Sequence, residues 1–143
     1  MRPIKRRSGE RGTMLTELAL VMPLLILMLM LVLEGSRVIR THQILNNAAR
    51  EGARLSVQQE NMGNTGGIIT QVINYASQNG VTLTAANITV SQGALIPNGG
   101  VSIPASIVTV TYTYTPTFLS VLTYVGLPAS FPLLAQAEFR NFY

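Results

Sequence analysis

The sequence predicts an α+β fold in which a long N-terminal helix, transmembrane in its first half, packs on a small antiparallel sheet. Three observations support this prediction. Residues 15–33 are apolar with Glu17 as their only charge, which suits a helix that crosses a membrane once. Apolar residues then recur at helical spacing, without a proline, to about residue 59. Within residues 81–140, several stretches alternate apolar and polar residues, as half-buried strands do.

The charge of the chain is concentrated before the apolar run. The first twelve residues hold five positive side chains and one negative side chain, which accounts for the whole net charge of +4. These residues are Arg2, Lys5, Arg6, Arg7, Arg11 and Glu10. Positive residues beside an apolar span hold that end in the cytoplasm, so the remainder of the chain is expected to be exported. The neutral body offers no basic stripe, and a nucleic-acid partner is therefore not expected.

Composition argues against catalysis and cofactor binding. The chain has no cysteine, no aspartate and a single histidine, His42, so neither thiol chemistry nor a metal cluster is expected. No Asp, Glu, Lys or Arg occurs between Asn61 and Ala137, so hydroxyl side chains there have no base nearby in sequence. We therefore expect neither an enzyme nor a cofactor. This uncharged region suits an exported polar domain or one packed against partners.

Residues 15–33 are long enough to cross a membrane as a helix. At about 1.5 Å of rise per residue they span about 28 Å, close to the roughly 30 Å thickness of the hydrocarbon layer. A cleavable secretory signal is the competing interpretation, but its apolar region is about 7–15 residues long and ends in a small-x-small site. Here the longer run is followed by Glu34-Gly35-Ser36-Arg37. A membrane anchor is therefore favoured, with residues 13–33 as the transmembrane segment.

Pro23 falls inside this span. Proline lacks an N–H, so the carbonyl of Ala19 loses its helical partner and a kink or local loosening is expected. Membrane helices tolerate such a proline where neighbours or local adjustment satisfy the freed carbonyl. We interpret Pro23 as a simple helix kink.

Glu17 is the one carboxylate that an inserted helix would bury, and charges buried in membranes usually mark function. Cleavage after Gly12 would leave an α-amino group on Thr13. Positions i and i+4 share a helix face, so this amine would lie beside Glu17, or at the depth of a neighbour's Glu17 in a staggered bundle. Pairing offsets much of the cost of burial and fixes the axial register of the helices. In the alternative interpretation, Glu17 snorkels to the cytoplasmic interface.

Two motifs resemble those of the TadE-like pseudopilins of the tight-adherence (Flp) pilus machinery. The first, Glu17-Leu18-Ala19-Leu20-Val21-Met22-Pro23-Leu24-Leu25, is similar to the apolar core that follows the cleavage site in that family. The second, Asn46-Asn47-Ala48-Ala49-Arg50-Glu51-Gly52-Ala53-Arg54, is similar to a signature that follows the membrane helix. A weaker similarity covers residues 135–140. The order and spacing of the two motifs make the resemblance specific over residues 1–57.

The resemblance implies maturation by a dedicated prepilin peptidase between Gly12 and Thr13, on the cytoplasmic side. Gly12 would be required because the peptidase cleft accepts no side chain there, and Glu17 would become the fifth residue of the mature chain. Two positions depart from common patterns. Leu18 stands where an aromatic residue is frequent, and Thr13 replaces the phenylalanine usual in type IVa pilins, which leaves N-methylation open.

The resemblance also implies a minor pseudopilin of a Flp/Tad-type pilus or a type II/IV-like secretion machine. The major Flp pilin has almost nothing after its helix, whereas this chain has a sizeable exported domain. The implied partners are the prepilin peptidase, other pilins or pseudopilins, the pilus assembly platform and the lipid bilayer of the bacterial inner membrane. The alternative is a signal-anchored exported adhesin or binding module that is not processed.

Residues 34–60 are expected to continue the helix outside the membrane. Glu34 and Arg37 stand three residues apart and are expected to form a weakly stabilising pair. Ala48, Gly52 and Ser56 form a stripe of small residues that permits close approach of another backbone. This stripe suits either a contact with another pseudopilin helix or packing beneath the chain's own sheet. The second interpretation is favoured, because the following strands need a surface to cover.

The remainder of the chain is expected to form a small exported α+β domain. A glycine-rich turn at 63–67 precedes a short amphipathic helix that ends near residue 79. Residues 117–125 are apolar and suit another short helix. Strands are expected at 81–84, 88–91, 107–115 and 132–140, with a loop at 97–100. The predicted organisation is thus a leader at 1–12, a transmembrane helix at 13–33, its exported continuation at 34–60 and the domain at 61–143.

Overall fold

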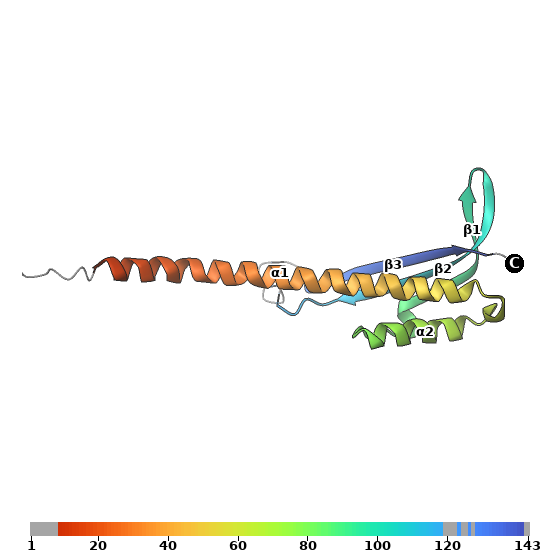
Figure 1. Cartoon of the computed structure of the whole chain (residues 1–143), viewed down its shortest axis with the longest axis horizontal. Coiled ribbons are helices and arrows are strands. Elements are labelled where there is room, and N and C mark those ends of the chain that lie inside the picture. The colour runs from red at the N-terminus through yellow and green to blue at the C-terminus, as the bar shows by residue number, and fades with distance from the viewer. Residues whose placement is uncertain (1–8, 119–122, 124–125, 127, 142–143) are drawn as a thin grey trace, which may run out of the picture.

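The computed structural model describes residues 9–118, 123, 126 and 128–141. The elements follow in the order α1 (Gly9–Ser56), η1 (Gln59–Asn61), α2 (Thr65–Gln78), η2 (Ala85–Asn87), β1 (Ile88–Asn98), β2 (Val101–Tyr114) and β3 (Phe131–Arg140). Figure 1 shows α1 as a long rod whose first half stands free, while its second half lies along the sheet. The predicted α+β fold, with a long helix packed on a small antiparallel sheet, is confirmed.

The free half of α1 is an apolar surface that no other described part of the chain covers. Among its side chains, Leu20 is 81% exposed and Leu24 is 67% exposed. In the described residues, α1 is the one helix long and apolar enough to cross a membrane, which agrees with the single predicted span. The helix continues through Pro23 without interruption, and Figure 1 shows α1 as one unbroken ribbon. Local loosening at the carbonyl of Ala19 stays a prediction.

The sheet has three antiparallel strands in the order β1-β2-β3, so β2 is central. One face of the sheet packs on the second half of α1, and α2 packs beside α1. The core between them is made of small and branched side chains. Its fully buried members include Leu45, Ala49, Ala53, Val72, Val108 and Val110. Small residues on α1 let the helix axis approach the sheet closely, which explains why a chain this short can bury a continuous core.

A hydrogen-bond network centred on Gln92 closes the far end of α1. The register of β1 against β2 shifts between Ser91 and Ala94, so Gln92 lies in a bulge. Its amide nitrogen donates to the carbonyls of Ser56 at 3.2 Å and Asn61 at 2.9 Å. Its side-chain oxygen accepts from the backbone N–H of Gly63 at 2.9 Å. The bulge therefore satisfies backbone groups where the helix stops, which fixes α1 against the sheet.

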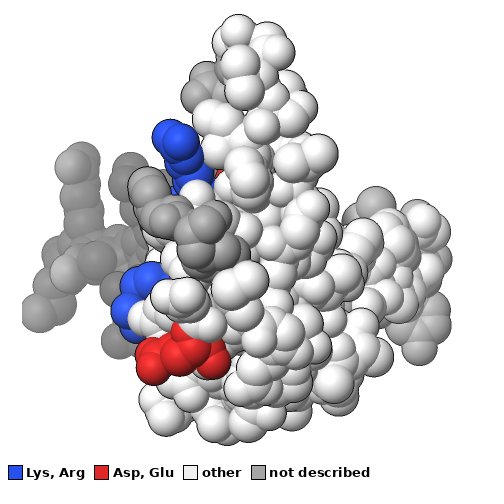
Figure 2. All heavy atoms as spheres, turned by 90° about the vertical axis from the view of Figure 1, so that its right-hand side faces the viewer, with Lys and Arg blue, Asp and Glu red and all other residues white. Residues whose placement is uncertain are grey.

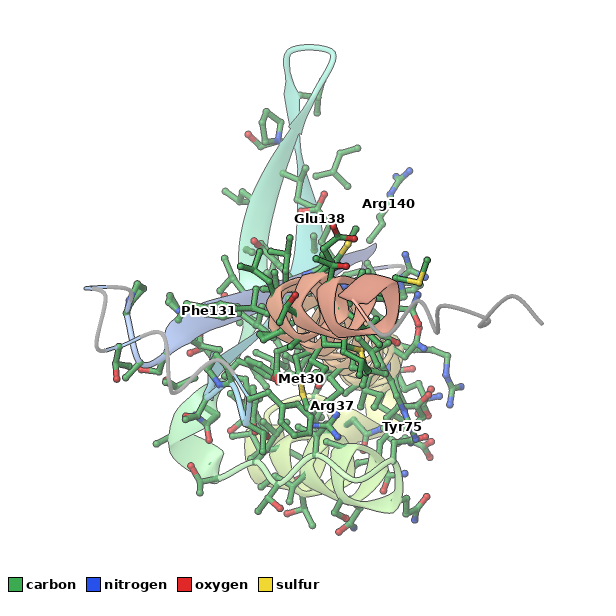
Figure 3. All side chains as sticks on the ribbon, turned by 90° about the vertical axis from the view of Figure 1, so that its left-hand side faces the viewer. Met30, Arg37, Tyr75, Phe131, Glu138 and Arg140 are labelled. Atoms are coloured by element: carbon green, nitrogen blue, oxygen red, sulfur yellow. The ribbon has the colours of Figure 1, made fainter. Side chains whose placement is uncertain are left out.

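Beyond this bulge, β1 and β2 form an arm that projects away from α1 (Figures 1 and 3). The predicted loop at 97–100 is its tip, because Asn98 pairs with Val101 around Gly99 and Gly100. Figure 2 views the end of the molecule farthest from the free half of α1, and most of that surface is uncharged. This agrees with the absence of charged residues between Asn61 and Ala137.

Two secondary-structure predictions are wrong. Residues 81–84 do not form a strand, although Val81 and Leu83 are buried. Asn87 instead accepts hydrogen bonds from the backbone N–H and hydroxyl of Thr84 at 2.9 and 2.7 Å, which winds the chain into η2. The apolar and polar residues of 81–84 alternate because this irregular segment lies on the core and buries every second side chain. The long helix ends at Ser56, three residues before the predicted end near Gln59, where η1 begins.

The other elements are close to their predictions. The short helix is α2, with Asn64 as its N-cap accepting from the N–H of Gly67 at 3.1 Å. The strands at 88–91 and 107–115 are longer than predicted, since both continue into the arm. The last strand is β3, as predicted. Most of the helix suggested at 117–125 lies outside the described residues.

Candidate assembly site

The free half of α1 places Glu17 on a surface of exposed apolar side chains. Glu17 itself is exposed, and so are Met14, Leu18 and Val21 around it. The nearby hydroxyl of Thr16 is satisfied within the helix, because it donates to the carbonyl of Thr13 at 2.8 Å. Within the described residues no hydrogen bond or ion pair holds the carboxylate of Glu17, which this stretch would carry into a lipid or helix-packed environment.

Gly12 is not required by the packing of the chain. A Cβ atom built at Gly12 would meet no other described atom within 4 Å. Gly52 behaves in the opposite way, since its Cβ would lie 2.5 Å from a methyl carbon of Val72 and 3.3 Å from one of Val108. A packing reason therefore exists for glycine at position 52 and not at position 12.

The stripe of small residues packs within the chain. Ala48 and Ser56 are 0% exposed, and Gly52 is buried. The neighbours of Gly52 are Val72 on α2 and Val108 on β2, so the stripe serves the chain's own core. This is the arrangement that the sequence favoured over a contact with another subunit.

Glu34 forms a buried site where the free half of α1 ends. Its side chain is 1% exposed, although it directly follows the apolar run. The hydroxyl of Tyr114 donates to its Oε1 at 2.6 Å. The backbone N–H groups of Thr117 and Phe118 donate to Oε1 at 3.2 Å and Oε2 at 3.0 Å. Three donors thus hold both carboxylate oxygens and fasten the end of β2 to α1.

The same contacts set the acidity of the two side chains. The hydrogen bond from Tyr114 lowers the pKa of Glu34 below its usual value, against the opposing effect of burial, and the backbone donors and Arg37 add to the lowering. Burial and the hydrogen bond to Glu34 raise the pKa of Tyr114 to about 12. Glu34 is therefore ionised and Tyr114 is protonated at neutral pH.

The surface pair expected between Glu34 and Arg37 takes a different form. The carboxylate turns inward, and the guanidinium carbon of Arg37 lies 4.6 Å from the ring centroid of Phe118. The electrostatic effect of Arg37 on Glu34 remains, as a minor contribution. Sequence reasoning missed this site because Glu34 and Tyr114 are 80 residues apart. The one local signal for this site is the position of Glu34, an acidic residue directly after the apolar run.

His42 is an exposed residue of α1. Its Nε2 lies 3.3 Å from the carbonyl oxygen of Leu134, and its Nδ1 lies 3.1 Å from the amide nitrogen of Asn46. His42 therefore links α1 to the edge strand β3 through its hydrogen bond with Leu134, while Asn46 of α1 holds the other ring nitrogen.

Comparison with known families identifies the helix. Residues 12–54 match the family model described as TadE-like protein. The N-terminal helix is TadE-like. The TadE-like segment begins at Gly12, includes Glu17 and Glu34, and ends two residues before the end of α1. The predicted resemblance to the TadE-like family is thereby confirmed over these residues. No curated protein and no solved structure matches the chain significantly.

The TadE-like segment joins two surfaces of different kinds. Its first part is the exposed apolar half of α1, and its second part is the buried face beneath the sheet. The sheet and α2 lie outside the matched residues.

Proposed function

We propose that the protein is a minor pseudopilin of a Flp/Tad-type pilus, cut by a prepilin peptidase between Gly12 and Thr13. It is held in the bacterial inner membrane by residues 13–33, with a cytoplasmic N-terminus and an exported domain. Its role is assembly through the N-terminal helix, and we propose no catalytic activity. The observation that carries this proposal is the TadE-like match over residues 12–54.

The position of the match supports processing. It begins at Gly12, where the chain's own packing does not explain a glycine. The five positive residues of the leader all precede this point, so cleavage removes the charges that set the orientation and leaves a neutral amine-bearing chain for assembly. The new α-amino group on Thr13 then lies one helical turn from Glu17.

Intact-mass measurement of the membrane-extracted protein tests the processing step. In cells with the peptidase we expect a mass that lacks residues 1–12, and Gly12→Leu should retain them. Gly35→Ala is the matched control, because an added methyl there also meets no described atom within 4 Å. It should be processed normally. An uncut wild-type chain in peptidase-positive cells would favour an unprocessed signal-anchored adhesin or binding module instead.

A further inference from the structure

An open cleft of about 410 Å³ lies between α1, the end of α2 and the end of β2. Two arginines from α1, Arg37 and Arg40, line it together with Thr41. Asn79 contributes from the end of α2 and Tyr114 from the end of β2. Figure 3 looks along α1 from its N-terminal side and places Arg37 between α1 and α2. The cleft is thus on the side of the domain that faces the free half of α1.

The cleft lies at the depth of lipid headgroups if residues 13–33 span the bilayer. The exposed apolar run ends at Leu33, and at about 1.5 Å per residue Arg37 lies about 6 Å and Arg40 about 10 Å beyond it. The headgroup region on each side of a bilayer is about 5–8 Å thick. Arg37 therefore lies within the headgroup layer, and Arg40 lies just beyond it with a side chain that leans back towards the N-terminal turn of the helix and so towards the same layer.

The cleft carries a net positive charge, because two arginines line it and the one buried carboxylate beside them, Glu34, interacts with Arg37 only weakly. The carboxylate of Glu34, the acidic group next to it, is buried and held by Tyr114 and two backbone N–H groups. Arg37 and Arg40 are both exposed. The walls from α2 and β2 belong to the region without charged residues, so no carboxylate from them faces the arginines. The hydroxyl of Thr41 and the amide of Asn79 add neutral polar groups.

We propose that this cleft binds the phosphate of an anionic phospholipid from the exported leaflet, with Arg37 and Arg40 as the cationic ligands. Guanidinium groups pair well with phosphate oxygens, and basic pockets beside membrane helices suit anionic headgroups. The acyl chains have a matching path, because Leu33 is 45% exposed and Leu29 is 58% exposed on the helix face that carries Arg40. A lipid fits the two arginines and the apolar surface together, whereas a free phosphate ion would contact the arginines alone. This proposal rests on the membrane-spanning part of the proposed function and not on cleavage or pilus assembly.

Native mass spectrometry of the full chain, purified in mild detergent, tests the proposal. The protein is incubated with phosphatidylglycerol or phosphatidylcholine, and the retained lipid is counted. We expect wild type to retain phosphatidylglycerol preferentially and Arg40→Gln to weaken its retention about tenfold or more. The matched control is Arg50→Gln, which removes an exposed charge from the same helix farther from the bilayer. It should retain the lipid as wild type does.

Two further arms complete the test. Arg40→Lys keeps the charge and should restore much of the retention, which a folding defect at this position would not allow. Excess inorganic phosphate should leave the bound phosphatidylglycerol in place; complete displacement would show a free-phosphate site and overturn the proposal. Equal retention of the two lipids, or equal behaviour of Arg40→Gln and Arg50→Gln, would also overturn it. An uncut N-terminus in the mass spectrum would refute processing while leaving the comparison of the two variants intact.

Discussion

The phenolic hydroxyl of Tyr114, the last residue of β2, donates to Oε1 of Glu34 at 2.6 Å. The ring of Tyr114 also packs against Phe131, the first residue of β3, with centroids 5.5 Å apart. Because Glu34 follows the apolar run of α1, this contact fixes the sheet at the point where the helix leaves the predicted span. The Gln92 network fixes the opposite end, so the domain is tied to α1 at both ends of their shared surface.

Tyr114→Phe should destabilise the exported domain by about 1.5–3 kcal/mol, since it removes a hydrogen bond to a buried charged group. The ring contact with Phe131 remains, so the loss isolates the hydroxyl. Chemical unfolding of the detergent-solubilised full chain, followed by near-UV circular dichroism, measures the change. Tyr112→Phe is the control, because Tyr112 is only partly buried and makes no hydrogen bond through its hydroxyl within the described residues. Equal stability of Tyr114→Phe and wild type would show that the contact contributes nothing.

The same pair predicts how stability depends on pH. The pKa of Glu34 is lowered in the fold, chiefly by the hydrogen bond from Tyr114, so its stabilisation is present above the usual value of 4.5. It is lost as the pH falls below 4.5 towards the folded pKa. The pKa of Tyr114 is raised from 10.0 to about 12, so its contribution is present below pH 10 and lost as the pH rises through 12. Unfolding free energies measured across both windows should fall at each end, and Glu34→Gln should flatten the acid side.

Gly52→Ala should destabilise the fold although alanine favours helices. The added methyl would lie 2.5 Å from Val72, which is fully buried and stiff at its β-carbon. Overpacking costs about 1–3 kcal/mol and outweighs a gain in helix propensity of about 1 kcal/mol. Gly35→Ala in the same helix meets no such contact and should be neutral or stabilising. Thermal unfolding of the two variants compares them directly, and equal midpoints would contradict the packing argument.

The parts of the fold that the sequence predicts well are those with sustained periodicity. The helical spacing of apolar residues in the second half of α1 and the alternation in β3 specify their own structures, since each repeats one spacing over many residues. Val81 and Leu83 alternate in the same way but lie on the core from an irregular segment, because Asn87 closes a turn on Thr84. The length of β1 was underestimated because the bulge at Gln92 interrupts its alternation.

The candidate site likewise has one residue that the sequence predicts and one that it does not. Glu17 stands out in the sequence because a lone charge within an apolar run has no local structural reason. Glu34 did not stand out, since its partners come from a strand end and a loop 80 residues away or more. A local pattern cannot encode such a contact, and only the folded sheet brings Tyr114 to the helix.

The piliation of cells that carry Glu17→Ala as their only copy tests the account's central claim most directly. We expect the intact mass to show normal loss of residues 1–12, while surface pili decrease about tenfold or more because the register-fixing charge pair is lost. Glu60→Ala, which removes an exposed carboxylate in η1, should leave both processing and piliation unchanged. Normal piliation of the Glu17→Ala cells would mean that this carboxylate only snorkels to the interface and would contradict its role in assembly.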